Sequence, residues 1–338
     1  MKFLSIKKGI VKGICLALCI GVCAYGVLVS PSNVCGVKKG DKTSAPIILN
    51  LWHLDTFEGG TGSRKQFLLS VAREFEKQND GVLISVREHT KNSLESQTQL
   101  PDILSYGVGV TPKNASKLTV DKGFSSGEIN GETYALPWAR GGYFLLSFSE
   151  IAGKVNFDTV TVSEGDFNTP QLAFYTAGFT AKKLVVKKPV DAYSDFITGQ
   201  AKVLLGTQRD LNRLMQKGLA VYSLPIEEYS DLYQYISVTT TSQIKKSYAE
   251  KFINYLTSKS VQESLTKIGM YSPYYQKIYA DGLIAVGQDI KPKYTLHAFT
   301  EYSVLVGVKK NFSGVEDFRA HEINIKKLLI NLDKFSLI

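Results

Sequence analysis

The apolar residues follow two different periods in turn, and this pattern predicts an α/β fold. Residues 47–51, "IILNL", are a continuous apolar run of the kind that forms a buried strand. The next segment carries apolar side chains at helical spacing from Phe67 to Phe75, and "VLISV" at 82–86 is again a strand pattern. Strand, helix and strand in this order predict a parallel crossover.

Capping and turn residues mark the limits of further elements. Ser63 and Thr207 each begin a four-residue capping pattern, which predicts that a helix starts there. Asn130-Gly131 is the dipeptide typical of a tight hairpin. Other elements are expected as a strand at 101–107, helices that begin near 242 and 260, and a last helix over 313–333.

Length and charge narrow the class of protein. A chain of 338 residues is too long for one small domain, so we expect two compact lobes. The net charge is +9, but four of the lysines lie in the first 12 residues, which leaves +9 − 4 = +5 for the remainder. A body this mildly basic does not call for a nucleic-acid partner, although an anionic cell envelope would suit it.

The N-terminal segment has the pattern of an export leader. A basic start precedes an uncharged run at 13–30, which suits a secretory signal and is also long enough to be an uncleaved membrane anchor. All four cysteines lie in or just after this leader, and Cys35 stands where a bacterial lipoprotein would be acylated. Val34 replaces the small residue expected before that cysteine, so a lipid anchor at Cys35 and a plain anchor or cleaved leader both remain open.

Polar and aromatic residues gather where the first strands end. Ligands of parallel sheets sit beyond the carboxyl ends of the strands, and glycines such as those at 59, 60 and 62 let the backbone approach a ligand. The alternative is a solvated connector with Trp52 in the core. The candidate ligand-binding residues of this edge are Trp52, His53, Glu58, Thr61 and Tyr106, with Asp55 beside them.

Two further segments supply candidates for the opposite wall of a cleft. Trp138 offers a flat apolar face and Arg140 a planar donor fork, on an extended segment that crosses from one region to the next. Thr207 and Arg209 stand at a helix start. The alternatives are that Trp138 packs under the crossing with Arg140 in solvent, and that Thr207 only caps its helix.

The chain shows no motif for catalysis or for metal binding. The four histidines are scattered, and neither a clustered ligand spacing, a nucleophile elbow nor a phosphate-binding lysine loop occurs. Because no nucleophile and base can be named, we expect no enzyme, no cofactor and no metal.

The order of three stretches resembles the extracellular solute-binding proteins of ABC importers, in the branch around maltose-binding protein. The first runs from "LNLWHLDTFEGGTGSRKQF" to "VLISV", and the second joins "PDILSYG" to "INGETYALPWARGGYFLLSF". The third joins "FITGQAKVLLG" to "SYAEKFINYLTSKSVQESLTKIGMYSPY". Together they are spread over most of positions 47–275. The segment at 107–128 is shorter than is usual in this family, and the second lobe also looks trimmed.

This resemblance implies a two-lobed periplasmic-binding-protein-like fold of class II. Each lobe would be a mixed sheet flanked by helices, with a cleft between the lobes. The chain would pass between lobes near 135–145 and 225–238, with a third passage near 285–295 left open. The expected limits are 1–34 for the leader, 35–45 for a tether, 46–140 plus 230–288 for the first lobe, and 141–229 plus 289–338 for the second.

Two functions follow from the resemblance. The first is capture of a small polar solute, with a sugar or oligosaccharide favoured, by a monomer that presents it to ABC permease subunits in the membrane. The second is a membrane-tethered module that keeps the fold without import and regulates a sensor or contacts the envelope. Both place the protein outside the cytoplasmic membrane, held at its N-terminus.

Overall fold

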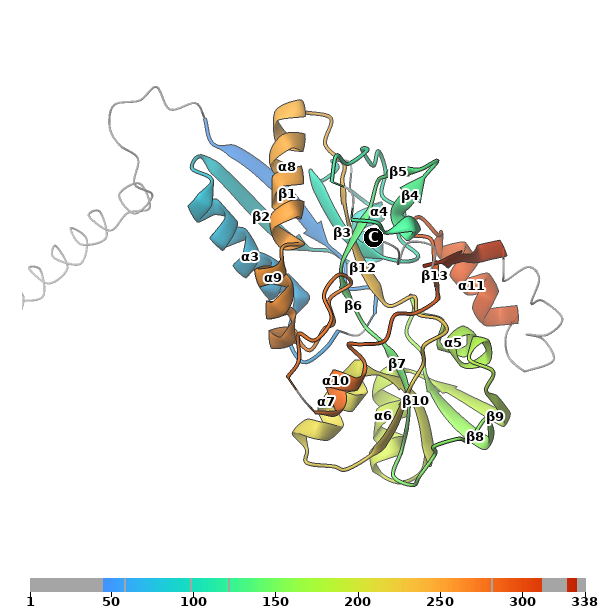
Figure 1. The fold of residues 1–338 in the computed structure, drawn as a ribbon. Coiled ribbons are helices and arrows are strands. Elements are labelled where there is room, and N and C mark those ends of the chain that lie inside the picture. Colours follow the sequence, from blue (N-terminus) through green and yellow to red (C-terminus); the bar gives the residue numbers. More distant parts are fainter. Residues whose placement is uncertain are drawn as a thin grey trace, which may run out of the picture. The chain divides into compact units, whose positions relative to one another are not determined.

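A computed structural model describes residues 45–57, 59–97, 99–120, 122–280, 282–311 and 327–332 (Figure 1). Ile47 begins the compact unit to which every described helix and strand belongs. Cys35, the leader and Glu58 lie outside the described residues, so the expectations for them stay predictions.

The first sheet is mixed and has five strands in the order β2-β1-β3-β12-β6. β1 pairs in parallel with β2 and β3, whereas β12 runs antiparallel to β3 and β6. Helices α3 (Arg64–Gln78) and α8 (Gln243–Leu256) pack against each other beside this sheet, with the Phe75 and Phe252 rings 5.5 Å apart (Figure 1). The strands are β1 (Ile47–His53), β2 (Val82–Glu88), β3 (Ile103–Gly107), β12 (Tyr233–Val238) and β6 (Leu136–Arg140).

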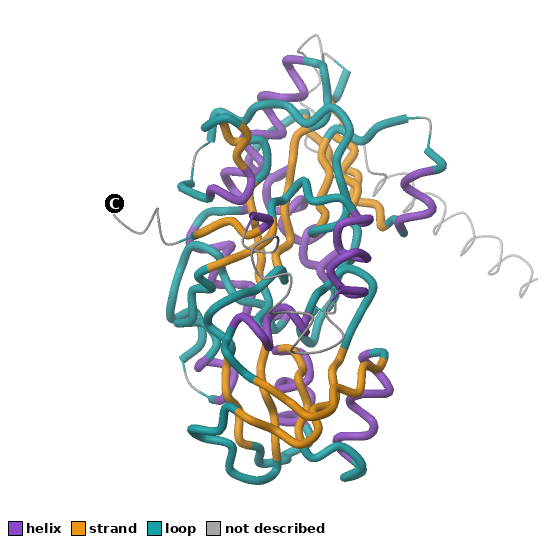
Figure 2. Tube along the Cα trace, turned by 90° about the vertical axis from the view of Figure 1, so that its right-hand side faces the viewer, coloured by secondary structure: helices purple, strands orange, loops and turns teal. Residues whose placement is uncertain are grey.

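The second sheet is also mixed and has the order β11-β7-β10-β8-β9. β8 pairs in parallel with β10 and β9, and β7 runs antiparallel to β10 and β11. Its strands are β11 (Tyr222–Pro225), β7 (Tyr143–Ser147), β10 (Val203–Thr207), β8 (Asn156–Ser163) and β9 (Thr180–Lys187), and its helices are α5 (Pro170–Thr176), α6 (Pro189–Ile197) and α7 (Gln208–Gln216). Two mixed sheets flanked by helices confirm the predicted fold class (Figure 2).

Short segments connect the two sheets. The chain leaves the first sheet after Arg140 and enters the second at Tyr143, and it returns between Pro225 and Tyr233. The amide of Gly141 donates a 2.6 Å hydrogen bond to the Leu232 carbonyl, so these two connections run side by side. The residue limits expected for the two lobes stay a prediction.

Several expected helix and turn limits are confirmed. The Ser63 hydroxyl accepts from the Gln66 amide at the start of α3, and Thr207 and Asp210 form a complete capping box at the start of α7. Asn130 and Gly131 both have positive φ, 54° and 78°, as a primed hairpin turn between β4 (Glu128–Ile129) and β5 (Glu132–Thr133) requires.

One expected element is wrong at its end. The last helix was predicted to extend to 333, but Leu329–Asn331 form strand β14, which pairs with β13 (Tyr294–Leu296). Residues 312–326 lie outside the described residues. The other elements are α4 (Lys91–Glu95), η1 (Ser125–Gly127), α9 (Lys259–Glu263), η2 (Ser264–Ile268), α10 (Leu283–Val286) and α11 (Tyr302–Asn311).

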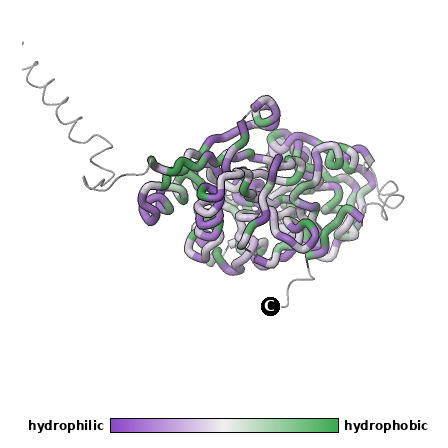
Figure 3. The backbone as a smooth tube through the Cα atoms, turned by 90° about the horizontal axis from the view of Figure 1, so that it is seen from above, coloured by the Kyte–Doolittle hydropathy of each residue, from purple (hydrophilic) through white to green (hydrophobic). Residues whose placement is uncertain are grey.

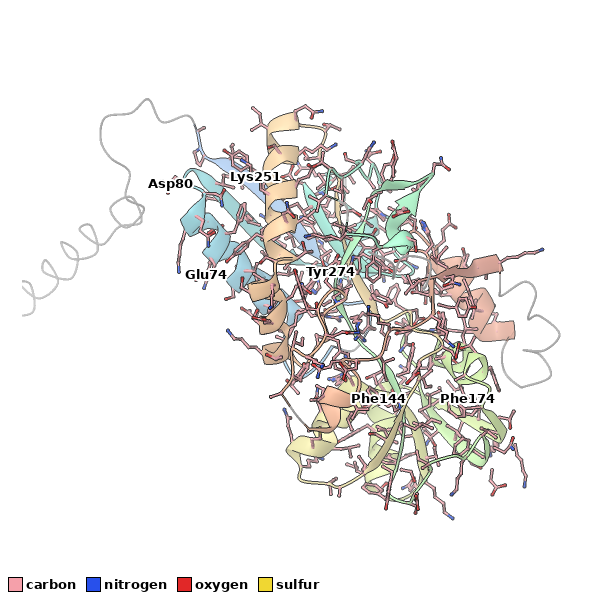
Figure 4. The ribbon with its side chains drawn as sticks, in the orientation of Figure 1. Glu74, Asp80, Phe144, Phe174, Lys251 and Tyr274 are labelled. Atoms are coloured by element: carbon pink, nitrogen blue, oxygen red, sulfur yellow. The ribbon has the colours of Figure 1, made fainter. Side chains whose placement is uncertain are left out.

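Apolar side chains from both sheets form the core. Hydrophobic and hydrophilic residues are interspersed along the described chain (Figure 3). The strands of both sheets contribute fully buried apolar side chains. Phe144 of β7 and Phe174 of α5 are both buried but belong to separate apolar clusters (Figure 4). The second sheet is therefore packed on both of its faces.

Candidate functional site

A pocket of about 590 Å³, here called the cleft pocket, is lined by loops that follow strands of both sheets. One wall is the loop between β1 and α3, and the other consists of segments that follow β8, β9 and β10. All four strands belong to parallel pairs, and their carboxyl ends are the place where such sheets bind ligands. The lining residues are Asp55, Thr56, Phe57, Gly59, Gly60, Thr61, Gly62, Arg64, Glu164, Gly165, Asp166, Phe167, Lys188, Pro189 and Arg209.

The loop after β1 is glycine-rich because it lies tightly against residues 268 and 269. A Cβ atom on Gly60 would stand 2.0 Å from the Ile268 carbonyl oxygen, and only glycine avoids that overlap. The next amide, that of Thr61, donates a 3.1 Å hydrogen bond to the same carbonyl. The glycines therefore hold this wall close to the η2 segment and leave Thr61 exposed at the pocket.

His53 is buried beneath this wall and has a defined tautomer. Ser105 Oγ accepts hydrogen bonds from Trp138 Nε1 at 2.9 Å and from Gln234 Nε2 at 3.2 Å, so its own proton goes to His53 Nδ1 at 3.0 Å. His53 then carries its hydrogen on Nε2 and donates it to Asp55 Oδ1 at 2.8 Å. Although these groups follow the order serine, histidine and aspartate, Ser105 is fully buried and does not line the cleft pocket.

Asp55 is held in place from behind and faces the cleft pocket. Its Oδ1 atom accepts the hydrogen bond from His53 Nε2 and forms an ion pair with Arg64 Nε at 2.6 Å. The Asp55 side chain is nevertheless 44% exposed and lines the pocket. Burial raises the pKa of Asp55, but the His53 hydrogen bond and the Arg64 charge together have a larger, opposite effect. The pKa therefore falls from the usual 3.8 to about 2. The carboxylate is therefore ionised and oriented before a ligand arrives.

The chain should lose stability when it is acidified, because both of these groups bind protons less readily in the folded state. Burial lowers the pKa of His53 below its usual 6.5, against the opposing effect of the Asp55 hydrogen bond. The unfolded chain therefore takes up more protons, first below pH 6.5 at His53 and then below pH 3.8 at Asp55, until the folded Asp55 titrates at about 2. The loss of stability due to His53 is measured as a fall in the thermal unfolding midpoint between about pH 7.5 and about pH 5. His53→Gln, which keeps a donor toward Asp55 but cannot titrate, should show a flatter profile; equal profiles would contradict this account.

Two of the predicted ligand-binding residues, Thr61 and Arg209, do line the cleft pocket. They approach it from opposite walls, one from the loop after β1 and the other from the start of α7. Trp52 lies elsewhere: it stacks on His89 at 4.2 Å and lines a different pocket, described below. Glu58 lies outside the described residues.

The other predicted residues are buried and do not line the cleft pocket. Trp138 is fully buried, stacked on Phe67 at 5.7 Å, which is the packed position that the sequence analysis left open for it. Arg140 is buried rather than solvated, since it donates to the carbonyls of Ser272 at 3.1 Å and Gln288 at 2.6 Å.

The last two predicted residues have structural partners. Tyr106 is fully buried, with its hydroxyl 3.1 Å from Ser237 Oγ. Thr207 is buried and caps α7, the alternative considered above. Neither side chain is available to a ligand in this arrangement.

Most residues of the second wall were not among the candidates predicted from the sequence. Glu164, Asp166 and Lys188 line the cleft pocket directly after β8 and β9. The apolar alternation of "FDTVTVS" and the run "LVV" were the available signals, because a strand there would have placed these charges at its carboxyl end.

Among the described residues, no group of three or more histidine, cysteine, aspartate or glutamate side chains could hold a metal ion. In the same part of the chain, no helix combines the length and the apolar character needed to cross a bilayer.

Several solved structures that bind sugars or other solutes have a similar fold. The GacH receptor of Streptomyces glaucescens, solved alone and with acarbose, matches with a TM-score of 0.60 at 14% identity, over 84% of this chain and 99% of that chain. Iron-bound HitA of Pseudomonas aeruginosa matches with a TM-score of 0.50 at 13% identity, over 79% of this chain and 99% of that chain. Maltose-binding proteins are also among the matches, so the chain has the two-lobed fold that its sequence resembles.

A further match is to a two-component system protein described as mediating signal transduction. Its TM-score is 0.53 at 13% identity, over 78% of this chain and 99% of that chain. No protein-family model and no curated protein sequence matches the chain. Because the structural matches differ in what they bind and do, the fold alone does not select a solute.

Proposed function

We propose that the chain is an extracytoplasmic solute-binding protein that captures a small polar solute in the cleft pocket by closure of its two lobes. The observation that carries this proposal is the origin of the lining, since loops from both sheets meet around one pocket. A solute that touches both walls gains its full set of contacts only when the lobes are together.

The lining favours a solute with many hydrogen-bonding groups. The oriented Asp55 carboxylate accepts, Arg209 and Lys188 donate, and the glycine-rich loop offers backbone groups at close range. Carbohydrates and similar polyhydroxylated solutes present both donors and acceptors in this way. Neither tryptophan of the chain lines the pocket, so stacking on an indole is not part of this recognition.

ABC permease subunits are the proposed recipients of the solute. The chain would act as a monomer held at the outer face of the cytoplasmic membrane, through lipidated Cys35 or through an uncleaved N-terminal anchor. Comparing the membrane retention of the wild type with that of Cys35→Ser separates these two attachments, because only the lipid model predicts release.

A thermal-shift screen of the full chain against sugars, oligosaccharides, polyols and oligopeptides tests the proposal. A bound solute at one hundred times its dissociation constant should add about 2.7 kcal/mol to the free energy of unfolding. Arg209→Ala should weaken binding of that solute by about tenfold or more, because it removes charged hydrogen bonds. Arg73→Ala, on α3 and outside the pocket lining, is the matched control, and equal losses in both variants would sink the assignment of the site.

Closure of the two lobes on the solute should also change the size of the molecule in solution. Small-angle scattering of the chain with the screened solute should give a smaller radius of gyration than the chain alone. A confirmed solute that leaves the radius unchanged would show that binding does not require lobe movement.

A regulatory function is the second candidate, and one structural feature favours it. Between β3 and η1 the described residues form no helix, where the resembled family usually has helices, so one part of the first lobe is reduced. A module of this kind could contact a sensor, as the match to a signal-transduction protein suggests for the fold. Deleting the gene would then change transcription without reducing uptake of the solute, whereas an importer subunit predicts loss of uptake.

A further inference from the structure

A second pocket, here called the Trp52 pocket, lies on the first sheet and shares no lining residue with the cleft pocket. Its volume is about 490 Å³, and Trp52 and Leu104, which are register partners on β1 and β3, contribute to its floor. Both side chains are buried, with 6% and 3% of their surface exposed. The pocket is lined by Trp52, Lys91, Leu94, Glu95, Gln97, Leu100, Pro101, Leu104, Gly109, Val110, Thr111, Pro112, Lys113, Thr239, Glu301, Tyr302 and Ser303.

Among the described residues, this face of the first sheet has little cover, which leaves room for the pocket. α4 is only five residues long, and the described residues between β3 and η1 contain no helix. Segments from three directions therefore enclose a hollow: α4, the chain on either side of β3, and the start of α11. A concave space with walls on several sides holds a small molecule better than a flat face would.

The chemistry of the walls is mainly apolar and carries no net charge. Leucine, valine, proline and aromatic side chains supply the floor and walls, while the rim has two lysines and two glutamates. Lys91 is already engaged, since its ammonium lies 3.8 Å from Glu95 and 3.5 Å from the centre of the Tyr302 ring. The Thr239 hydroxyl donates to the Pro101 carbonyl at 2.7 Å, so this polar group in the lining is satisfied.

The contact between Phe167 and Tyr302 separates this pocket from the cleft pocket. Phe167 lines the cleft pocket, Tyr302 lines the Trp52 pocket, and their ring centres are 5.3 Å apart. These two aromatic rings therefore form the wall between the two pockets.

We infer that the Trp52 pocket is a second binding site, for a neutral and mainly apolar small molecule that contains a ring. The volume lies within the range of about 300–1,000 Å³ that is usual for small-molecule sites. A neutral ligand is favoured because the rim charges cancel and an apolar floor would leave a buried ionic group without a partner. A ring suits the site because the indole of Trp52 offers a flat apolar contact.

The fluorescence of N-phenylnaphthylamine, a neutral aromatic probe, tests this inference on the full chain. The probe should bind at one saturable site with a dissociation constant in the micromolar range, and Leu94→Glu should raise that constant at least about tenfold. Leu100→Glu should do the same, and it guards against a folding defect because the Leu100 side chain is already 43% exposed. Val190→Glu introduces the same charge at an aliphatic residue outside both pockets, 64% exposed, and should leave binding unchanged.

Three results would overturn the inference. The first is the absence of saturable binding, and the second is parental affinity in both leucine variants. The third is loss of probe binding in Arg209→Ala, which would place the probe in the cleft pocket. Retention of probe binding in Arg209→Ala, together with its loss in the leucine variants, supports a separate site.

Discussion

Trp138→Ala is expected to lower the free energy of unfolding by about 3–5 kcal/mol, the range for a large aromatic removed from a core. Trp138 is fully buried, stacks on Phe67 of α3, and donates its indole N–H to Ser105 Oγ at 2.9 Å. The substitution removes the packing and also one of the two donors that fix the Ser105 hydroxyl toward His53. Denaturant-induced unfolding of the variant and the wild type measures the loss.

Trp138→Phe is the matched variant. It keeps an aromatic ring against Phe67 but loses the hydrogen bond, so it should cost clearly less than the alanine variant. Solute affinity, measured by calorimetry on protein that remains folded, should change little because Trp138 does not line the cleft pocket. A stable alanine variant with weakened affinity would instead make Trp138 a ligand contact, which is the role that the sequence analysis predicted.

The position of Trp138 could not be derived from its own stretch of sequence. β6 is buried along its whole length, so its pattern does not distinguish a residue facing a cleft from one facing the core. Phe67, which covers the indole, comes from a helix about 70 positions earlier, and Ser105 comes from another strand. The burial of Arg140 could not be predicted either, because the carbonyls to which it donates belong to distant residues, Ser272 and Gln288.

Local signals predicted the fold well. The capping patterns at Ser63 and Thr207 and the turn at Asn130 are decided by residues within a few positions of each other. The helix expected over 313–333 failed at its end because Leu329–Asn331 pair with a strand more than 30 residues away. A distant partner of this kind overrides a local helical pattern.

In the candidate site, too, local sequence patterns were informative and contacts with distant segments were not predicted. On the wall after β1, an apolar strand followed by glycines is a local pattern that ends at a known edge, and it brought Thr61 into the candidate set. Trp52 and His53 from the same stretch do not line the cleft pocket. The wall after β8 and β9 was missed, since the short apolar patterns of these strands do not show that they pair in parallel with each other and with β10. Identification of Thr61 and Arg209 as lining residues came from helix and strand ends, whereas the role of Asp55 depends on His53 and Arg64 behind it.

Asp231→Ala is expected to lower the free energy of unfolding by roughly 3 kcal/mol, because it removes the acceptor of three buried hydrogen bonds. Asp231 lies in the connection that returns to the first sheet, and only 1% of its surface is exposed. Its Oδ1 atom accepts from the Tyr143 hydroxyl at 2.6 Å, and Oδ2 accepts from the Thr169 amide and hydroxyl at 2.8 and 2.7 Å. Since burial raises the pKa of this carboxyl, removing it also relieves a desolvation cost, which keeps the expected loss below the sum of three broken bonds.

Asp158→Ala supplies the matched control for this last prediction. Asp158 is in β8, its side chain is 84% exposed, and its partner Lys182 is exposed to a similar degree. The same change of aspartate to alanine should therefore leave the unfolding midpoint unchanged, because water and salt screen an ion pair of this kind. Chemical denaturation of both variants decides the matter. Equal effects in Asp231→Ala and Asp158→Ala would show that the buried carboxyl does not hold the second connection to β7 and α5, and that solvent can replace it.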